Sequence, residues 1–322
     1  MSRYPAARSL PGGFLIFVLL ALVAACAPQS QRLLATAGAY PEPVELTLVP
    51  FFPQEEYQCG PAALATVLVW SGVAVTPAEL TPQVYLPDRQ GSLQLELLAA
   101  SRRHGRVPYV LQPQLESLAA EVASGNPVLV LQNLGLSFVP TWHYAVVVGF
   151  DLANNEIVLR SGREQRHVVA LETFEHTWAR SQYWAVVILP PDRLPFTAEE
   201  LRYLQSVAAL EQAGMKQDAA TSYATALKRW PQSLAALMGL GNARYALGDL
   251  AGAEDAFRRA VKFHPDSAPA HNNLAQTLAD RKRYDEAETT ARRAIELGAA
   301  DPFIEFYRHT LDEILKARAP VQ

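Results

Sequence analysis

The sequence has almost no cysteine and little charge imbalance. Its 28 basic and 32 acidic residues give a formal net charge of -4, which argues against a nucleic-acid partner. The two cysteines, Cys26 and Cys59, stand in contexts that each favour a free thiol, so no disulfide is expected. The patterns G-x-x-x-x-G-K-[ST], H-E-x-x-H and paired C-x-x-C do not occur. We therefore expect no ATP, no metal and no other cofactor.

What is present is enough sequence for two domains. A chain of 322 residues is too long for one typical core. Residues 45–192 alternate short apolar strands with helical stretches, which is typical of an α+β domain. From Thr197 the strand pattern stops, and Ala, Leu, Glu and Arg recur at helical spacing. We predict an α+β domain over residues 45–192 and an all-α domain over residues 197–318.

The N-terminus carries an export signal over residues 1–25. Basic residues precede an unbroken apolar run from Phe14 to Ala25, which is shorter than the roughly 20 residues of a membrane-spanning helix. The run ends L-V-A-A-C at Cys26, which resembles the bacterial lipobox. That resemblance implies a lipid on Cys26, and Ala27 in place of an aspartate implies the outer membrane, facing the periplasm. The alternative is ordinary cleavage beside an incidental cysteine. Residues 26–44 are expected to form a tether.

A repeat runs through the helical region. Alanines recur in constant phase at 219, 253 and 287, and again at 226, 260 and 294, with prolines at 231 and 265. A period of about 34 residues, with small residues where helices touch and an aromatic residue one turn later, resembles the tetratricopeptide repeat. The resemblance implies about three repeats plus a capping helix, and a concave surface that binds a protein partner. Deleting this region is expected to leave hydrolysis of a small probe intact.

The candidate nucleophile is Cys59. Pro61 suits a helix start and Gly72 a helix end, and the apolar residues between them surround the helix, which should therefore be buried. A thiol at this N-terminus would face unpaired backbone N–H groups, which favour the thiolate. The matching base is His143, which begins the strongest strand pattern of the chain, W-H-Y-A-V-V-V-G-F-D.

Together these motifs resemble the bacteriocin-leader-processing cysteine peptidases, which have a papain-like fold. The resemblance implies that Cys59 and His143 form the catalytic pair and that Gln54 donates a hydrogen bond to the oxyanion. Gln54 stands one residue closer to the cysteine than the family pattern has it. Gln58 is a second candidate, although a side chain next to the nucleophile easily points away. The ATP-binding and transporter parts that often accompany this family are missing from the sequence.

The third catalytic position departs from the family pattern. An aspartate followed by proline is expected on the strand after the hairpin, whereas this chain has Leu159-Arg160-Ser161-Gly162. Ser161 matches the aspartate best and could accept a hydrogen bond from His143. Asp151 is nearer in sequence, but it lies about 26 Å of extended strand from His143, which excludes it.

We therefore expect a membrane-anchored periplasmic cysteine peptidase that hydrolyses peptide bonds of a polypeptide substrate through Cys59 and His143. Two other functions stay open. The weakened third position would suit a peptidase-like binding module without turnover. The same pair would also suit a cell-wall amide hydrolase, since the fold does not fix the acyl donor.

Overall fold

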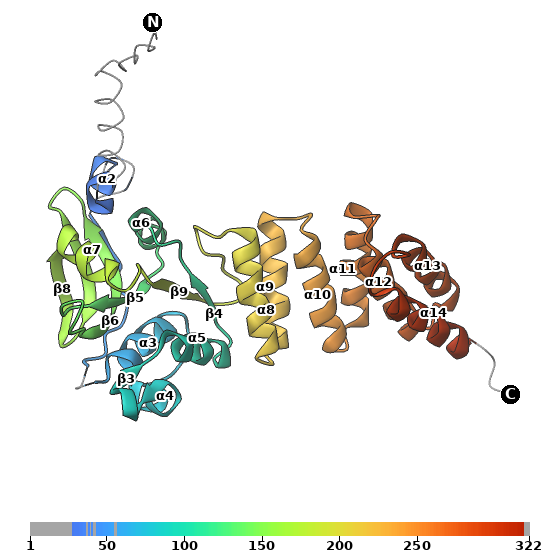
Figure 1. Cartoon of the computed structure of the whole chain (residues 1–322), viewed down its shortest axis with the longest axis horizontal. Coiled ribbons are helices and arrows are strands. Elements are labelled where there is room, and N and C mark those ends of the chain that lie inside the picture. Colours follow the sequence, from blue (N-terminus) through green and yellow to red (C-terminus); the bar gives the residue numbers. More distant parts are fainter. Residues whose placement is uncertain (1–27, 37, 39, 41–42, 55–56, 319–322) are drawn as a thin grey trace, which may run out of the picture.

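The computed structural model confirms the predicted fold class: an α+β domain is followed by an array of helices (Figure 1). It describes residues 28–36, 38, 40, 43–54 and 57–318. The expected signal peptide and Cys26 lie outside these residues. Among the residues described, no helix is long and apolar enough to span a membrane.

The N-terminal domain is built on one antiparallel sheet with the strand order β4-β9-β5-β6-β7-β8, in which β1 also pairs with β6. A separate hairpin joins β2 and β3. The strands are β1 (Val44–Glu45), β2 (Tyr85–Leu86), β3 (Gly91–Ser92), β4 (Val107–Val110), β5 (Val128–Asn133), β6 (Trp142–Asp151), β7 (Glu156–Ser161), β8 (Glu164–Ala170) and β9 (Ala185–Leu189).

Helices cover both faces of this sheet (Figure 1). Along β6, Tyr144, Val146 and Val148 join one apolar cluster, whereas Ala145 and Val147 join the other, because neighbouring side chains of a strand point to opposite faces. One face packs against α3 (Cys59–Trp70) and α5 (Gln94–Arg103), which α4 (Pro77–Val84) contacts in turn. The other packs against α6 (Leu115–Ala123) and α7 (Leu171–Ala179), both of which α2 (Gln29–Ala35) contacts.

Helix α3 is buried along most of its length, as its apolar sequence predicts. Every residue from Gly60 to Leu68 is buried. The position after Cys59 requires glycine, because a Cβ at Gly60 would lie 2.3 Å from Oγ of Ser92. Only glycine lets the β2–β3 hairpin approach the first turn of α3. This approach places the hairpin beside Cys59.

The segment expected to be a tether is in part a docked helix, so the prediction is wrong for residues 29–35. Leu33 is only 1% exposed and belongs to the main core cluster. The buried carboxylate of Glu175 accepts hydrogen bonds at 2.7 Å from the backbone N–H groups of Gln29 and Ser30. A tether prediction from polar and small residues missed the packing of Leu33 and Leu34 and the carboxylate of Glu175, which accepts from the start of the helix.

The C-terminal domain consists of three helix pairs and a final helix. Gly241 shows why the pairs pack closely, since a Cβ there would lie 2.4 Å from the ring of Phe257. The repeat period is also visible in the backbone, where Gly214, Gly248 and Lys282 each have a positive φ at the end of the first helix of a pair. The helices are α8 (Glu200–Gln212), α9 (Lys216–Arg229), α10 (Leu234–Ala246), α11 (Leu250–Phe263), α12 (Ala268–Asp280), α13 (Tyr284–Leu297) and α14 (Ile304–Arg318).

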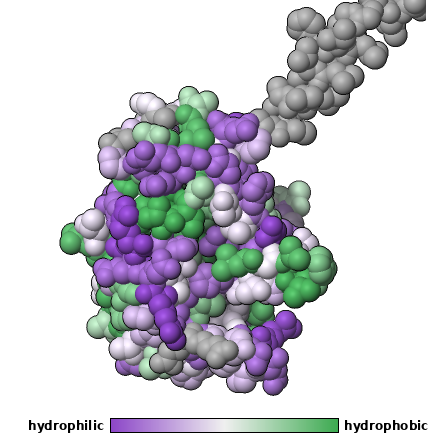
Figure 2. Space-filling view, turned by 90° about the vertical axis from the view of Figure 1, so that its left-hand side faces the viewer, coloured by the Kyte–Doolittle hydropathy of each residue, from purple (hydrophilic) through white to green (hydrophobic). Residues whose placement is uncertain are grey.

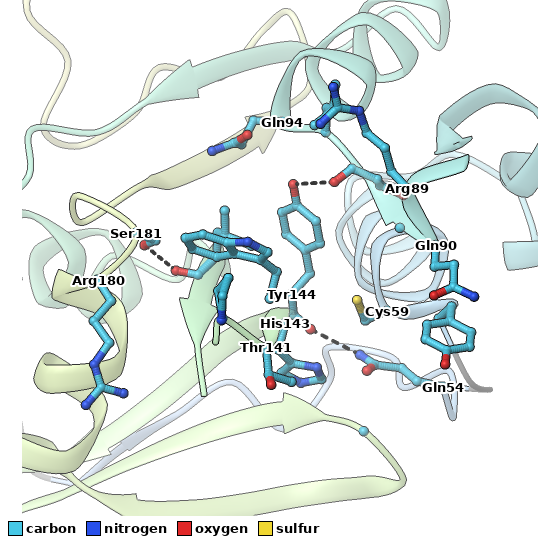
Figure 3. Close-up of a pocket in the computed structure, with 18 of the residues that line it drawn as sticks. Gln54, Cys59, Arg89, Gln90, Gln94, Thr141, His143, Tyr144, Arg180 and Ser181 are labelled. Carbon is cyan, nitrogen blue, oxygen red and sulfur yellow. Dashed lines mark hydrogen bonds between the residues drawn. The ribbon is translucent and has the colours of Figure 1, made fainter. Parts of the chain in front are cut away.

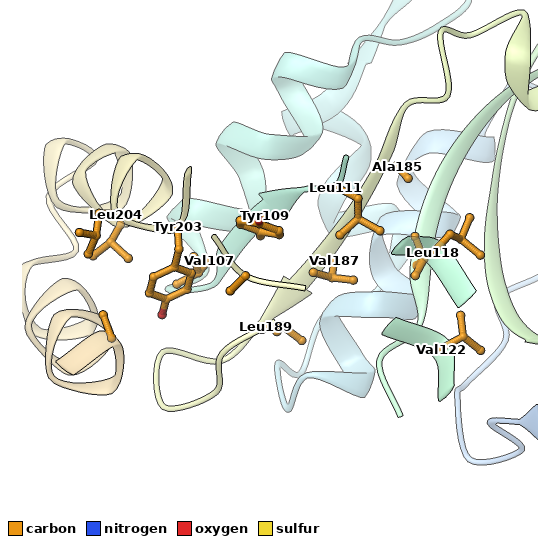
Figure 4. Close-up of a cluster of buried hydrophobic side chains, with 14 of the residues drawn as sticks. Val107, Tyr109, Leu111, Leu118, Val122, Ala185, Val187, Leu189, Tyr203 and Leu204 are labelled. Carbon is orange, nitrogen blue, oxygen red and sulfur yellow. The ribbon is translucent and has the colours of Figure 1, made fainter. Parts of the chain in front are cut away.

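The two domains share one core, so the expectation that the first works without the second finds no support in the structure. Tyr109 of β4 is fully buried beside α8 (Figure 4), and its hydroxyl donates to the carbonyl of Thr197 and accepts from the N–H of Glu199. The buried carboxylate of Glu121 accepts from both the backbone N–H and the hydroxyl of Thr197. One apolar cluster runs from Leu33 through the sheet into the repeats.

Deleting residues 197–322 is therefore expected to destabilise the N-terminal domain. The deletion exposes Tyr109 and the apolar side chains around it, each worth about 1.5–3 kcal/mol when fully buried. We expect the midpoint of thermal unfolding, followed by circular dichroism, to fall by more than 10 °C, on the order of the shift expected for a loss of several kcal/mol. Removing only residues 304–322 serves as the control, because the described part of this segment, α14, contacts α12 and α13 and not the sheet. A truncated domain that unfolds at the same temperature as the full chain would contradict the shared core.

Candidate active site

Cys59 and His143 line the same cleft, as the sequence predicted (Figure 3). Cys59 is the first residue of α3, and His143 lies near the start of β6, the strand in contact with α3. The cleft has a volume of about 1010 Å³. It is large enough to hold several residues of an extended polypeptide.

Burial governs the state of the Cys59 thiol. It raises the pKa of the thiol, and the backbone N–H groups of Tyr144 and Gly60 oppose that rise only in part. The N–H groups at the start of the helix therefore lower the pKa of the Cys59 thiol, as expected, but burial raises it by more. The loss of hydration disfavours the charged sulfur more than the nearby N–H groups favour it. At neutral pH the thiol is protonated.

His143 is held by Ser161, the residue that replaces the family's aspartate. Nε2 of His143 lies 2.8 Å from Oγ of Ser161. Burial lowers the pKa of His143 to about 4, and the proximity of His167 adds to this effect. The imidazole is therefore neutral at pH 7, and the pair Cys59–His143 rests as thiol and imidazole rather than as an ion pair.

A serine controls the imidazole less tightly than a carboxylate would. A carboxylate can only accept a hydrogen bond, so it places the ring proton on Nε2 and leaves the lone pair of Nδ1 free to act as a base. The hydroxyl of Ser161 can either accept from Nε2 or donate to it. Only the first arrangement leaves Nδ1 ready to take the proton of Cys59.

Gln54 reaches the cleft, and Gln58 does not. The side-chain Nε2 of Gln54 donates to the carbonyl of Tyr144 at 3.3 Å, which leaves its second N–H for another acceptor. The backbone N–H of Gln54 donates to the carbonyl of Gly162 at 2.9 Å, so the loop before Cys59 is held against the β7–β8 turn. The side chain of Gln58 instead accepts from the hydroxyl of Thr81 on α4. This geometry favours Gln54 as the oxyanion donor.

Several residues of the cleft were not predicted from the sequence. The β2–β3 hairpin supplies one wall, and the hydroxyl of Tyr144 fixes it by donating to the carbonyl of Ser92 at 3.2 Å. Three cleft residues, Tyr57, Gln90 and Gln182, have positive φ, a backbone conformation that non-glycine residues adopt at an energetic cost and that is frequent at functional sites. No sequence pattern predicts these backbone conformations. A cleft position for Tyr144, by contrast, could have been predicted, because it follows His143 in the chain.

The rim of the cleft is partly apolar. The loop between β5 and β6 exposes Leu134, Leu136, Phe138 and Val139, and the half-exposed Trp142 at its end lines the cleft. Seen from the end opposite the repeats, the domain shows apolar residues gathered in separate patches within a mostly polar surface (Figure 2).

Among the residues described, no group of three or more His, Cys, Asp or Glu could hold a metal ion. Asp151 caps the β6–β7 turn by accepting from Asn154.

A partly buried thiol at a helix start and a histidine on a strand of the antiparallel sheet line one cleft, which is the arrangement expected of a cysteine peptidase. Residues 46–186 match the model of the Peptidase_C39 like family, and residues 203–268 and 245–302 match two tetratricopeptide-repeat models. The chain therefore combines a Peptidase_C39-like domain with tetratricopeptide repeats, which confirms both resemblances.

Solved structures resemble each part of the chain. A protein described as a C39-like peptidase from Bacillus anthracis is 18% identical, covers 46% of this chain and 98% of its own, and has a TM-score of 0.40. The Yersinia enterocolitica type III secretion translocator chaperone SycD is 23% identical and covers 39% of this chain and 100% of its own, with a TM-score of 0.36. The search of curated proteins found no match.

Proposed function

We propose that this chain is a cysteine peptidase that hydrolyses peptide bonds through Cys59 and His143. One observation carries the proposal: the thiol and an imidazole held by Ser161 line one cleft of polypeptide size, with the amide of Gln54 beside them. The Peptidase_C39-like match of residues 46–186 supports the same class of reaction.

The chemistry begins with both groups neutral. His143 takes the proton of the Cys59 thiol as the sulfur attacks the carbonyl carbon of the peptide bond, and a C–S bond forms. The imidazolium then returns the proton to the leaving amine as the C–N bond breaks. Water, deprotonated by the same imidazole, hydrolyses the thioester and regenerates the thiol. The side-chain N–H of Gln54 and the backbone N–H of Cys59 stabilise the oxyanion in both halves.

A second candidate function is a peptidase-like binding module without turnover. The raised thiol pKa and the lowered imidazole pKa favour it, because both make proton transfer from Cys59 to His143 harder. The two functions differ in one measurement. An active peptidase cleaves an unfolded polypeptide in a reaction that Cys59→Ser removes, whereas a binding module retains the polypeptide uncleaved. Isolated peptidoglycan, assayed in parallel, tests for amide hydrolysis of the cell wall.

We propose that the repeats select a protein partner or substrate. Tetratricopeptide repeats generally mediate protein binding. Polar side chains join neighbouring repeats here, where Asn273 of α12 donates to Asn242 of α10 and Tyr245 donates to Asp280. Such a row of exposed polar groups offers hydrogen bonds to a bound peptide.

We further propose that a lipid on Cys26 anchors the protein to the outer membrane, with the domain facing the periplasm. Only Ala27 and Pro28 stand between Cys26 and α2. The three Cα-to-Cα steps from Cys26 to Gln29 span at most about 11 Å, so an acylated Cys26 would hold the docked helix α2 close to the membrane surface.

Replacing Cys26 with Ser is expected to release the protein from the membrane fraction. Firm membrane binding needs more than one acyl chain, and the variant has no thiol to which the lipid could be attached. The measurement is fractionation after a high-salt wash, with Cys59→Ser as the matched control that keeps Cys26. A Cys26→Ser variant that stays with the membranes would refute the lipid anchor.

A further inference from the structure

The described residues that line the cleft carry charge of one sign only. They include Arg89, Arg163 and Arg180 and no aspartate or glutamate. The chain as a whole has more acidic than basic residues, 32 against 28, so this bias does not follow from the composition. Clefts lined by one sign of charge concentrate the field and attract ligands of the opposite sign.

The three arginines come from separate elements that surround the reactive pair. Arg89 ends the short helix before the hairpin strand β3, Arg163 lies in the β7–β8 turn, and Arg180 follows α7. In Figure 3 Arg180 lies to the left of Cys59 and His143, and Arg89 lies above them. Positive charge therefore flanks the reacting bond on more than one side.

These charges are not neutralised within the described part of the chain. Arginines elsewhere pair with carboxylates, as Arg166 does with Glu45. The three cleft arginines form no ion pair with a described residue. Arg180 donates instead to the backbone carbonyls of Asn133 and Gly135, which fix its guanidinium without cancelling its charge.

We propose that the cleft selects polypeptides that carry acidic side chains near the reacting peptide bond, an inference that rests on the proposed peptidase function. Guanidinium groups recognise carboxylates through paired hydrogen bonds. The amide side chains of Gln90, Gln94 and Gln182 line the same cleft and suit the main chain between such carboxylates.

The first test reads the charge around Cys59 without requiring catalysis. In a Cys26→Ser background Cys59 is the single thiol. The quantity measured is its alkylation rate with anionic iodoacetate divided by its rate with neutral iodoacetamide. Both reagents react with the same thiolate, so the thiol pKa cancels. The triple variant Arg89→Gln, Arg163→Gln, Arg180→Gln is expected to lower the ratio about three- to tenfold.

The control removes the same charge from a distant surface. Arg292→Gln, Arg293→Gln and Arg308→Gln change exposed arginines of the last repeat and its capping helix. This triple is expected to leave the ratio unchanged. A cleft triple that behaves like the distant triple overturns the inference.

The second test measures ligand choice in the full chain with Cys59→Ala, which cannot react. A peptide with aspartates and glutamates and its twin with asparagines and glutamines are titrated by fluorescence anisotropy. The acidic peptide is expected to bind about tenfold more tightly, and the preference should weaken at high salt and in the cleft triple. Equal binding of the two peptides overturns the inference. If the acidic peptide binds more tightly but the protein with intact Cys59 cleaves neither peptide, only the proposed peptidase function is overturned.

Discussion

Replacing Cys59 with Ala, or His143 with Ala, is expected to abolish covalent reaction of the protein with a peptide-based thiol probe. The sulfur is the only nucleophile at the start of α3, and the imidazole is its base in a cleft where both groups are neutral at rest. We expect single-turnover labelling, read by intact-protein mass spectrometry, to fall at least 10⁴-fold for Cys59→Ala.

Two further variants rank the supporting groups. Gln54→Ala is expected to slow labelling about 10²- to 10³-fold, as the loss of one oxyanion donor does. Ser161→Ala removes one neutral hydrogen bond from His143, worth about 0.5–1.5 kcal/mol, and is expected to slow it only about 2- to 13-fold. Labelling of Cys59→Ala at the rate of the parent would overturn the catalytic assignment and leave the binding module as the better function.

The parts of the fold that periodicity governs could be predicted from the sequence. The alanines of the repeats recur at helical spacing and the apolar run of β6 is typical of a buried strand. The structure has helices and a strand, respectively, at these positions. The contact between Ser161 and His143 was also foreseeable, because both residues lie on paired strands whose hairpin turn is short. Local patterns and strand pairing carry that much information.

The remaining features depend on contacts between residues far apart in the chain. The docking of α2 depends on Glu175, and the shared core depends on Tyr109 and Glu121 meeting the start of the repeats. The thiol pKa depends on how much water the fold removes from Cys59, which a helix N-terminus alone does not reveal. The arginines of the cleft come from three separate segments, and no sequence spacing predicts that these segments meet.

Replacing Ser161 with Asp is expected to activate Cys59. A carboxylate beside Nε2 would accept its proton, fix the tautomer that leaves Nδ1 free, and raise the pKa of His143 from about 4 toward neutrality. The imidazolium that then forms favours the thiolate and lowers the pKa of Cys59. Since loss of such a carboxylate costs about 10⁴-fold elsewhere, we expect its gain to speed probe labelling at least tenfold.

The pH profile of iodoacetamide alkylation distinguishes this cause from a general loosening of the site. In the parent, the raised thiol pKa means that alkylation increases only in the alkaline range. In Ser161→Asp, an ion pair exists between the pKa of the thiol and that of the imidazolium, so a plateau of fast alkylation should extend below about pH 7 and disappear as the thiolate is protonated. Ser161→Asn, similar in size but uncharged, should keep the parental profile. If both variants give the parental profile, Ser161 does not hold the position from which a carboxylate would control His143.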